Sequence, residues 1–197
     1  MIFKVFKKYG FIGSIRLIRD IIFTKLIFPR QRIVRWPFYI RGKSIQWGSD
    51  LTTGVGLRID IIGQPESGIL IFGNNIQLND YVHIGVAKSV TIEDNVLIGS
   101  KVLITDHDHG IYRGNSQSDP YQPQIQKKIN SRPVHIESNV WIGEGVCILS
   151  GVRIGKNSII GSGSQVIRDV PENSIAVGSP ARVVKQWSFE LKEWKSL

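Results

Sequence analysis

Apolar side chains recur in this sequence as pairs two residues apart, and the pair repeats every six residues. One series of pairs occupies residues 70–104 and a second occupies residues 134–166, and together they make twelve units. Serine takes the first place of the pair in the last two units. Neither the helix period of about 3.6 residues nor plain strand alternation produces this spacing. A short strand with two inward side chains, followed by a turn, does.

Such units predict a β-solenoid, in which short strands stack as coils about 4.8 Å apart and fill the interior with valine and isoleucine. At three units per coil, the twelve units would give four coils. An ordinary β-sandwich would not keep one spacing so evenly. The repeats alone leave an inert structural or ice-binding solenoid open. Glycine follows five units, where a tight corner favours a residue without Cβ: Gly85, Gly99, Gly143, Gly155 and Gly161.

The repeat stops between Ile104 and Val134, where a segment rich in His, Asp, Gly, Ser, Pro and Gln takes its place. A solenoid can expel such a segment without disturbing its core, and loops on rigid scaffolds commonly carry chemistry. We therefore expect an extruded loop over residues 105–133. Near its start, aspartate and histidine alternate from Asp106 to His109.

The alternation favours acid–base chemistry over metal binding. In an extended segment His107 and His109 would point one way and the two aspartates the other, so the four would not converge on one ion. We predict no metal site. A neutral imidazole titrates near neutrality and can take a proton from an attacking hydroxyl. A carboxylate on its other nitrogen would fix the tautomer, and Asp106 is a candidate, as is any nearby carbonyl.

The two ends of the chain depart from the repeat and divide it into segments 1–43, 44–186 and 187–197. The first segment contains eleven Lys and Arg against one acid, so it carries +10, and the rest of the chain sums to −1. Its apolar residues at helical spacing predict an amphipathic helix: Phe11, Ile15, Ile18, Ile22 and Leu26. This helix is expected to lie on an anionic membrane surface, or to pack on the solenoid or a neighbouring subunit. The last segment predicts a short capping helix.

Composition limits the remaining functions. No nucleic-acid-binding motif accompanies the basic residues, so we expect no nucleic-acid partner. The single Cys147 excludes an intrachain disulfide and fits a reducing compartment. Charged residues interrupt the N-terminal apolar run, so neither a secretory signal nor a membrane span is expected. We expect a cytoplasmic protein, with the inner face of the cytoplasmic membrane as the surface that its basic segment could contact.

The hexapeptide units, the extruded loop and the stretch VWIGEGVCILSGVRIGKNSIIGSGSQVIRDVPENSIAVGSPARVV resemble the left-handed β-helix acyltransferases, relatives of galactoside, maltose and serine acetyltransferases. More narrowly, KYG at 8–10, GVGLRID at 54–60, NDYVHI at 79–84 and DHDHGI resemble bacterial lipopolysaccharide O-antigen O-acetyltransferases. The wider resemblance covers roughly residues 65–186, and the narrower one nearly the whole chain. It implies an all-β fold with a left-handed parallel β-helix, a homotrimer and acetyl-CoA as the acetyl donor.

The resemblance also implies roles for particular residues. The family's catalytic histidine falls on His107, with His109 as the second candidate, and an acceptor contact falls on Asn79. The aromatic side chain beside the thiol end of the cofactor falls on Trp141. This sequence departs from the family at Glu144, where an acid stands at a cofactor-contact position. The other cofactor contacts fall on these residues: Ser162, Ile167, Arg168, Arg182 and Lys185.

Three residues stand outside this set. His83 and His135 occupy outward positions of regular units, and we interpret them as surface or subunit-contact residues. Cys147 also faces outward between apolar neighbours. A covalent acyl-cysteine route is a minor alternative, because a reactive thiol needs an electropositive setting.

These expectations combine into one hypothesis. A trimeric β-solenoid transfers acetyl from acetyl-CoA directly to a sugar hydroxyl of a cell-surface polysaccharide, an O-antigen or its lipid-linked precursor. Each active site lies between adjacent subunits, because the loop of one chain must reach a flat face of another. Acetylation of a free oligosaccharide, serine or antibiotic is the alternative enzyme, and a non-catalytic structural solenoid is the alternative without catalysis.

Overall fold

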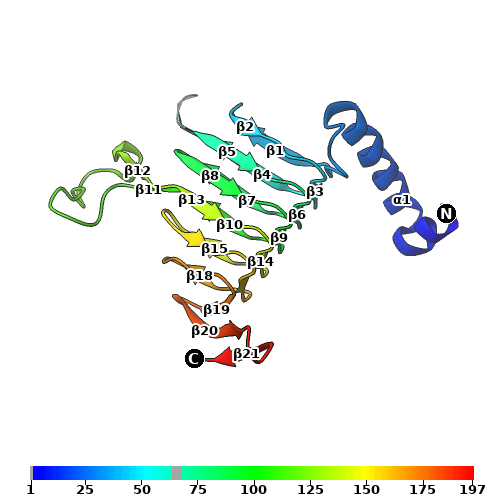
Figure 1. The fold of residues 1–197 in the computed structure, drawn as a ribbon. Coiled ribbons are helices and arrows are strands. Elements are labelled where there is room, and N and C mark those ends of the chain that lie inside the picture. Colours follow the sequence, from blue (N-terminus) through cyan, green and yellow to red (C-terminus); the bar gives the residue numbers. More distant parts are fainter. Residues whose placement is uncertain (1, 64–67) are drawn as a thin grey trace.

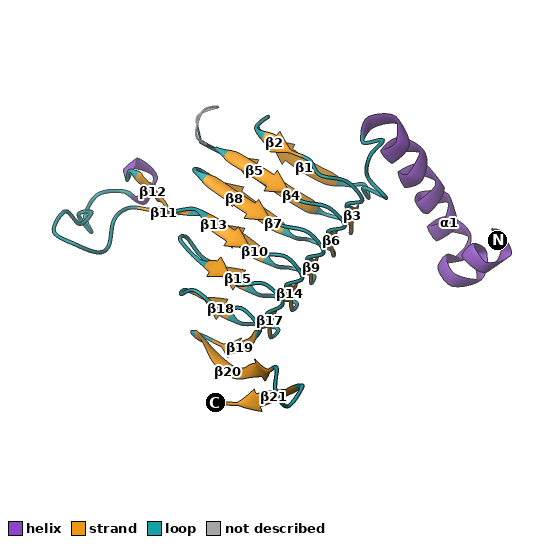
Figure 2. Ribbon diagram, viewed as in Figure 1, coloured by secondary structure: helices purple, strands orange, loops and turns teal. Residues whose placement is uncertain are grey.

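The structure is a computed structural model that describes residues 2–63 and 68–197. Three sheets of mainly parallel strands form the faces of a β-helix. Figure 1 shows a hairpin arm projecting from one side of this β-helix and a helix, α1, on the other. Figure 2 shows the short strands of successive coils stacked in chain order, with loops turning the corners between them.

Each face is named here after its first strand. The β1 sheet contains, in spatial order, β1 (Phe38–Arg41), β4 (Leu57–Ile61), β7 (His83–Val86), β10 (Leu103–Thr105), β15 (Cys147–Ile148) and β18 (Gln165–Val166). The β2 sheet contains β2 (Ile45–Gln46), β5 (Ile69–Phe72), β8 (Ser89–Ile92), β13 (Val134–Ile136) and β16 (Arg153–Ile154). The β3 sheet contains β3 (Thr52–Thr53), β6 (Gln77–Leu78), β9 (Leu97–Ile98), β14 (Trp141–Ile142), β17 (Ile159–Ile160), β19 (Ser174–Gly178), β20 (Ala181–Ser188) and β21 (Glu193–Ser196).

The core confirms the six-residue pattern. Every side chain of the twelve predicted pairs is at most 3% exposed, including the serines at positions 158 and 164. Those two hydroxyls are satisfied by the carbonyls of Pro171 and Gly161. Two inward side chains per unit, most of them valine, isoleucine or leucine, therefore fill each coil and stabilise the stack by removing apolar surface from water.

The coils extend further toward the N-terminus than the pattern predicted. Within the described residues the β1 sheet has six strands, one for each coil, where four coils were expected. The additional coils begin with β1, inside the segment 1–43. A seven-residue step from Phe38 to Ile45 and a polar inward residue, Thr53, break the six-residue count there, so the sequence pattern did not find them.

The glycines after each unit have a different cause from the one expected. None of the five adopts a left-handed backbone conformation. Instead, a Cβ at Gly99 would lie 2.6 Å from the backbone nitrogen of Glu144, and one at Gly155 would lie 2.4 Å from that of Glu172. At these two glycines the backbone of the next coil therefore passes too close for a side chain. The left-handed corners are taken largely by asparagine, which tolerates positive φ: Asn75, Asn95, Asn139, Asn157 and Asn173.

The C-terminal capping helix was a wrong prediction. Residues 187–197 contribute to an antiparallel hairpin of β20 and β21, which extends the β3 sheet past its last parallel strand. Trp187 and Trp194 pair across this hairpin, with ring centroids 5.4 Å apart. A seven-residue spacing fits one helix face, but it also fits two strands joined by a turn.

The helix α1 (Ile2–Ile27) was predicted, and its orientation is a finding. Gly10 interrupts it with a non-helical backbone conformation. The face toward the β-helix carries polar residues, Ser14, Asp20 and Thr24, each at most 2% exposed. Thr24 holds the helix in place, because its hydroxyl oxygen accepts a hydrogen bond from the Val34 amide at 2.8 Å. No helix in the described part of the chain is long and apolar enough to cross a bilayer.

Candidate functional site

The extruded arm leaves the β-helix at the corner between β10 and β13. Its base is a two-stranded antiparallel ribbon of β11 (His107–His109) and β12 (Ile129–Ser131), and a short 3-10 helix, η1 (Gln124–Gln126), precedes β12. Asp106 anchors the ribbon. Its fully buried carboxylate accepts hydrogen bonds from the amides of Ala87 and Lys88, each at 2.7 Å, and its carbonyl accepts one from Arg132.

The same carboxylate orients the imidazole of His107. Asp106 Oδ1 lies 3.0 Å from His107 Nδ1, and Thr105 Oγ1 lies 3.2 Å from that nitrogen. A proton on Nδ1 is favoured by the carboxylate, which leaves a lone pair on Nε2. Within the described residues Nε2 has no hydrogen-bond partner. A Cβ at Gly85 would lie 3.2 Å from Cε1 of the ring, so a larger residue at this position would crowd the imidazole.

His107 opens into a cavity of about 540 Å³ on the outer face of the β1 sheet. His109 lines the same cavity, and its ring centroid lies 6.2 Å from that of His107. The floor comes from successive coils, with Arg41 on β1, Asp60 on β4 and His83 on β7. A partly buried imidazole therefore faces a space large enough for a small ligand.

Asp60 joins the floor residues into one charged network. Its carboxylate contacts His83 Nε2 at 3.1 Å, Arg58 Nε at 2.5 Å and Arg41 Nε at 3.1 Å. Burial raises the pKa of Asp60, but hydrogen bonds from Arg58 and His83 and the charges of Arg58 and Arg41 outweigh it, so the pKa lies below its ordinary value. Asp60 is therefore an anion at neutral pH.

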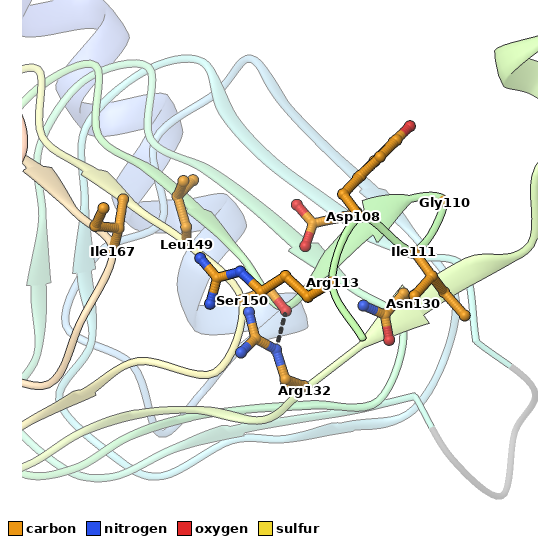
Figure 3. A pocket seen from close by; sticks show the side chains of 10 residues that line it. Asp108, Gly110, Ile111, Arg113, Asn130, Arg132, Leu149, Ser150 and Ile167 are labelled. Atoms are coloured by element: carbon orange, nitrogen blue, oxygen red, sulfur yellow. Dashed lines mark hydrogen bonds between the residues drawn. The ribbon is translucent and has the colours of Figure 1, made fainter. Parts of the chain in front are cut away.

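The other side of the arm borders a second cavity, of about 480 Å³ (Figure 3). Asp108 lines it, whereas the two histidines line the first cavity, so the alternation predicted for this segment holds for these three residues. Asp106 instead turns into the core. Figure 3 shows Arg132 at the wall of this second cavity, 3.4 Å from the hydroxyl of Ser150.

Comparison with known proteins gives the family. A sequence profile described as bacterial transferase hexapeptide (six repeats) matches residues 133–168, and one described as hexapeptide repeat of succinyl-transferase matches residues 89–111. The chain is 43% identical over 197 residues to the Escherichia coli K12 protein named "Putative lipopolysaccharide biosynthesis O-acetyl transferase WbbJ", with 99% of each chain covered. The chain belongs to the hexapeptide-repeat acetyltransferases.

Solved structures agree with this family. A maltose O-acetyltransferase from Clostridium difficile 630 is 31% identical with a TM-score of 0.59, over 73% of this chain and 70% of that one. A galactoside acetyltransferase in complex with coenzyme A is 30% identical with a TM-score of 0.53, over 76% of this chain and 64% of that one. The fold is thus the left-handed β-helix that the sequence predicted, and the protein is an acetyltransferase that uses acetyl-CoA, as members of this family do.

Most of the predicted cofactor residues lie on or beside a different face from that of His107. Trp141 stands on the outer side of the β3 sheet, where half of its surface is exposed, and Ser162 follows β17 at the next corner of that sheet. Arg182 and Lys185 lie on β20, at the C-terminal end of the same sheet. Ile167 and the exposed Arg168 follow β18, and Ile167 lines the cavity of Figure 3.

None of the remaining candidates lines the cavity of His107. Asn79 accepts a hydrogen bond from Gln77 and lines a groove of about 380 Å³ beside α1. Glu144 lies 3.4 Å from Lys101 as an exposed ion pair. Cys147 is half-buried, and its neighbours on the β1 sheet are Leu103 and Gln165. In the described ranges no group of His, Cys, Asp and Glu side chains could hold a metal ion.

Sequence reasoning missed the charged floor of the cavity. His83 was interpreted as a surface or subunit-contact residue, and Arg41, Arg58 and Asp60 were not singled out. These residues come from three coils, so they become neighbours only when the coils stack. Their separation by about one coil length was the available signal. His135 does not line this cavity, and it pairs with Glu93 at 2.7 Å beside the β2 sheet.

The lowered pKa of Asp60 gives a pH-dependent prediction. Because the carboxylate is more acidic when folded, its stabilisation is complete above the unfolded pKa of about 3.8 and is lost as the pH falls through the folded pKa. We expect Asp60→Asn to lower the free energy of unfolding at pH 7 by about 1 kcal/mol, since both arginine partners are more than half exposed and screened by water. The deficit should shrink at pH 3.

Urea unfolding at both pH values measures this deficit. The control is Glu190→Gln, which removes an exposed side-chain carboxylate near the C-terminus. A deficit that stays constant between pH 7 and pH 3 would contradict the ionic role of Asp60.

Proposed function

We propose that this enzyme transfers acetyl from acetyl-CoA to a sugar hydroxyl of a cell-surface polysaccharide or its lipid-linked precursor, with His107 as the general base. The proposed base is supported mainly by the 3.0 Å contact between Asp106 and His107 Nδ1, in an imidazole that lines an open cavity and whose Nε2 is free among the described residues. The saccharide acceptor is supported by the lipopolysaccharide-biosynthesis relative, which matches the chain over nearly its full length.

The arrangement suits direct transfer. Nε2 of His107 takes the proton as the acceptor hydroxyl oxygen attacks the thioester carbonyl, and the new C–O bond forms a tetrahedral intermediate. The buried Asp106 carboxylate stabilises the imidazolium at this stage. As the C–S bond breaks, the imidazolium returns its proton to the departing sulfur. The products are the acetyl ester and coenzyme A with a free thiol, and no covalent enzyme intermediate is needed.

The active site is completed by a second subunit in this proposal. Within one chain His107 faces the β1 sheet, whereas Trp141 and most of the cofactor residues lie on or beside the β3 sheet. A half-exposed indole on a rigid sheet is a costly surface unless something covers it. In a homotrimer the arm of one chain reaches the β3 sheet of the next, which brings the imidazole to the thioester held there.

His107→Ala is expected to lower kcat by a factor of about 10²–10⁴, because a positioned general base contributes that much. Asp106→Asn should also lower kcat, because the carboxylate that fixes the tautomer is lost. Release of the coenzyme A thiol with saccharide acceptors measures both effects. Cys147→Ala and His109→Ala serve as controls for the covalent route and for the second histidine.

Two outcomes would reject the proposed base. His107→Ala could turn over at the wild-type rate with every acceptor, or Cys147→Ala could abolish thiol release while His107→Ala does not. A free oligosaccharide, serine or an antibiotic could be acetylated faster than any polysaccharide precursor. That result would reject the proposed acceptor but leave the general-base mechanism in place.

We further propose that α1 lies on the anionic inner face of the cytoplasmic membrane. Its apolar stripe is turned away from the β-helix, since Phe11, Ile15, Ile18, Ile22 and Leu26 are 51–76% exposed. Arg19 and Lys25 flank the stripe by helix geometry, as expected for an in-plane helix whose cations reach lipid headgroups. The polar opposite face is already occupied by the β-helix.

The double variant Ile15→Asp, Ile22→Asp should lose binding to anionic vesicles, because it places two charges in the stripe. Flotation with vesicles measures this, and Ile125→Asp, at an isoleucine of the arm that is 90% exposed, is the matched control. Unchanged flotation of the double variant would exclude the membrane contact. Conversion of a trimer to monomers by the same variant would instead assign the stripe to a subunit interface.

A further inference from the structure

A cationic groove lies between α1 and the first coils, distant in the fold from the predicted cofactor residues. Its cavity of about 510 Å³ is lined from the helix by Tyr9, Arg16 and Arg19, and from the coils by Arg35, Trp36 and Tyr81, among others. The proposed acetyl-transfer chemistry uses none of these residues. Three arginines and three aromatic rings around one cavity are the groups that bind phosphate and stack on a ligand.

The charge of this groove is only partly neutralised. Asp20 is its one lining acid, and Arg19 pairs with it at 2.7 Å. The guanidinium groups of Arg16 and Arg35 have no hydrogen bond or ion pair among the described residues. The lining therefore keeps a net charge of about +2, which favours an anion with two charges.

The aromatic rings remain accessible. Trp36 is 55% exposed and Tyr81 is 61% exposed, although Arg19 stacks on the Trp36 ring at 5.1 Å. Both rings line the groove, so a ligand held by the arginines would also contact aromatic surface. Their position at the rim leaves room for a group attached to the anion.

The groove and the cavity of His107 lie at opposite ends of the same strands. Tyr81 lines the groove, and His83 and Gly85 follow it on β7, with Gly85 beneath the His107 ring. Tyr81 and Gly85 are four residues apart, so they are separated by at most about 13 Å along the chain. Between the two sites, Tyr39, Arg58 and His83 occupy neighbouring positions on the outer face of the β1 sheet. This row crosses the strands, and an oligosaccharide that extends along β7 from the groove would pass over it and reach the imidazole.

The groove also borders the apolar stripe of α1. Arg19 lies four residues after Ile15 and three before Ile22, so helix geometry places it at the edge of the stripe. A phosphate attached to a membrane lipid would therefore arrive beside these arginines at the level of the headgroups.

We propose that this groove binds the diphosphate of a lipid-linked saccharide, and that Arg16 and Arg35 hold it while the sugar chain extends over the β1 sheet toward His107. This inference rests on the proposed acetylation of a saccharide and specifies its acceptor as a prenyl diphosphate-linked oligosaccharide. The phosphates of coenzyme A are a different ligand, because their predicted contacts lie at the opposite, C-terminal end of the β-helix.

The test compares the double variant Arg16→Gln, Arg35→Gln with Arg30→Gln, an exposed arginine of the same segment that does not line the groove. Calorimetric titration with inorganic pyrophosphate, in a chelating buffer, should give wild-type binding that weakens at least tenfold in the double variant. Arg30→Gln should bind as the wild type does. Equal pyrophosphate affinity in all three proteins would overturn the proposal.

Kinetics identify the source of the anion. We expect the wild type to prefer a short-chain prenyl diphosphate-linked oligosaccharide over the same free oligosaccharide, as a ratio of kcat/KM. The double variant should lower this ratio at least tenfold. An unchanged ratio, or a rise in KM for acetyl-CoA instead, would overturn the assignment of the acceptor diphosphate. The assignment would also be overturned if the double variant lost binding to anionic vesicles but kept the wild-type ratio of kcat/KM values. The groove would then bind phospholipid headgroups.

The two proposals fail differently. Absence of acetyl transfer to either oligosaccharide would reject the saccharide acetyltransferase, and with it this acceptor, whatever the pyrophosphate titration gives. Normal transfer to both, without a preference that depends on Arg16 and Arg35, would leave the acetyltransferase intact and reject the groove.

Discussion

The interior of this β-helix admits two side chains from each six-residue unit, and those of successive coils lie over one another. Because each strand is hydrogen-bonded in parallel register to the coil before and the coil after it, chain that does not fit this count must leave at a corner. The arm does so between β10 and β13, and both strands keep their register with β7 and β8. Asp106 is buried where the arm leaves the β-helix, and its carboxylate fixes the orientation of the His107 imidazole.

The same stacking places the polar residues around His107 and the predicted cofactor residue Trp141 on different faces of the β-helix. Residues one coil apart become neighbours on one face, so Arg41, Asp60 and His83 form a charged floor under the arm although about twenty residues separate each from the next. Residues six apart lie on successive faces instead. Trp141 is therefore on the β3 sheet, whereas the cavity of His107 is on the β1 sheet. The fold thus offers extended surfaces for a donor and an acceptor, and adjacent subunits are expected to bring them together.

How far the sequence predicts this molecule depends on the range of each interaction. The core pairs and the exit of the arm were predictable because a local period dictates them, and the Asp106–His107 contact joins adjacent residues. The Asp60 network was missed because it forms between coils. The C-terminal hairpin was mistaken for a helix because Trp187 and Trp194 are seven residues apart, a spacing that both structures allow. The periodicity of α1 gave an apolar stripe but not the direction in which it faces.

The most direct test of this account is complementation between subunits. Chains carrying His107→Ala and chains carrying Trp141→Ala would be purified separately and also co-expressed with different tags, so that mixed trimers are isolated. We expect each variant alone to be nearly inactive and isolated mixed trimers to recover up to about one third of the wild-type sites, because one of their three interfaces pairs an intact His107 with an intact Trp141. Mixed trimers as inactive as the two variants alone would contradict an active site shared between chains.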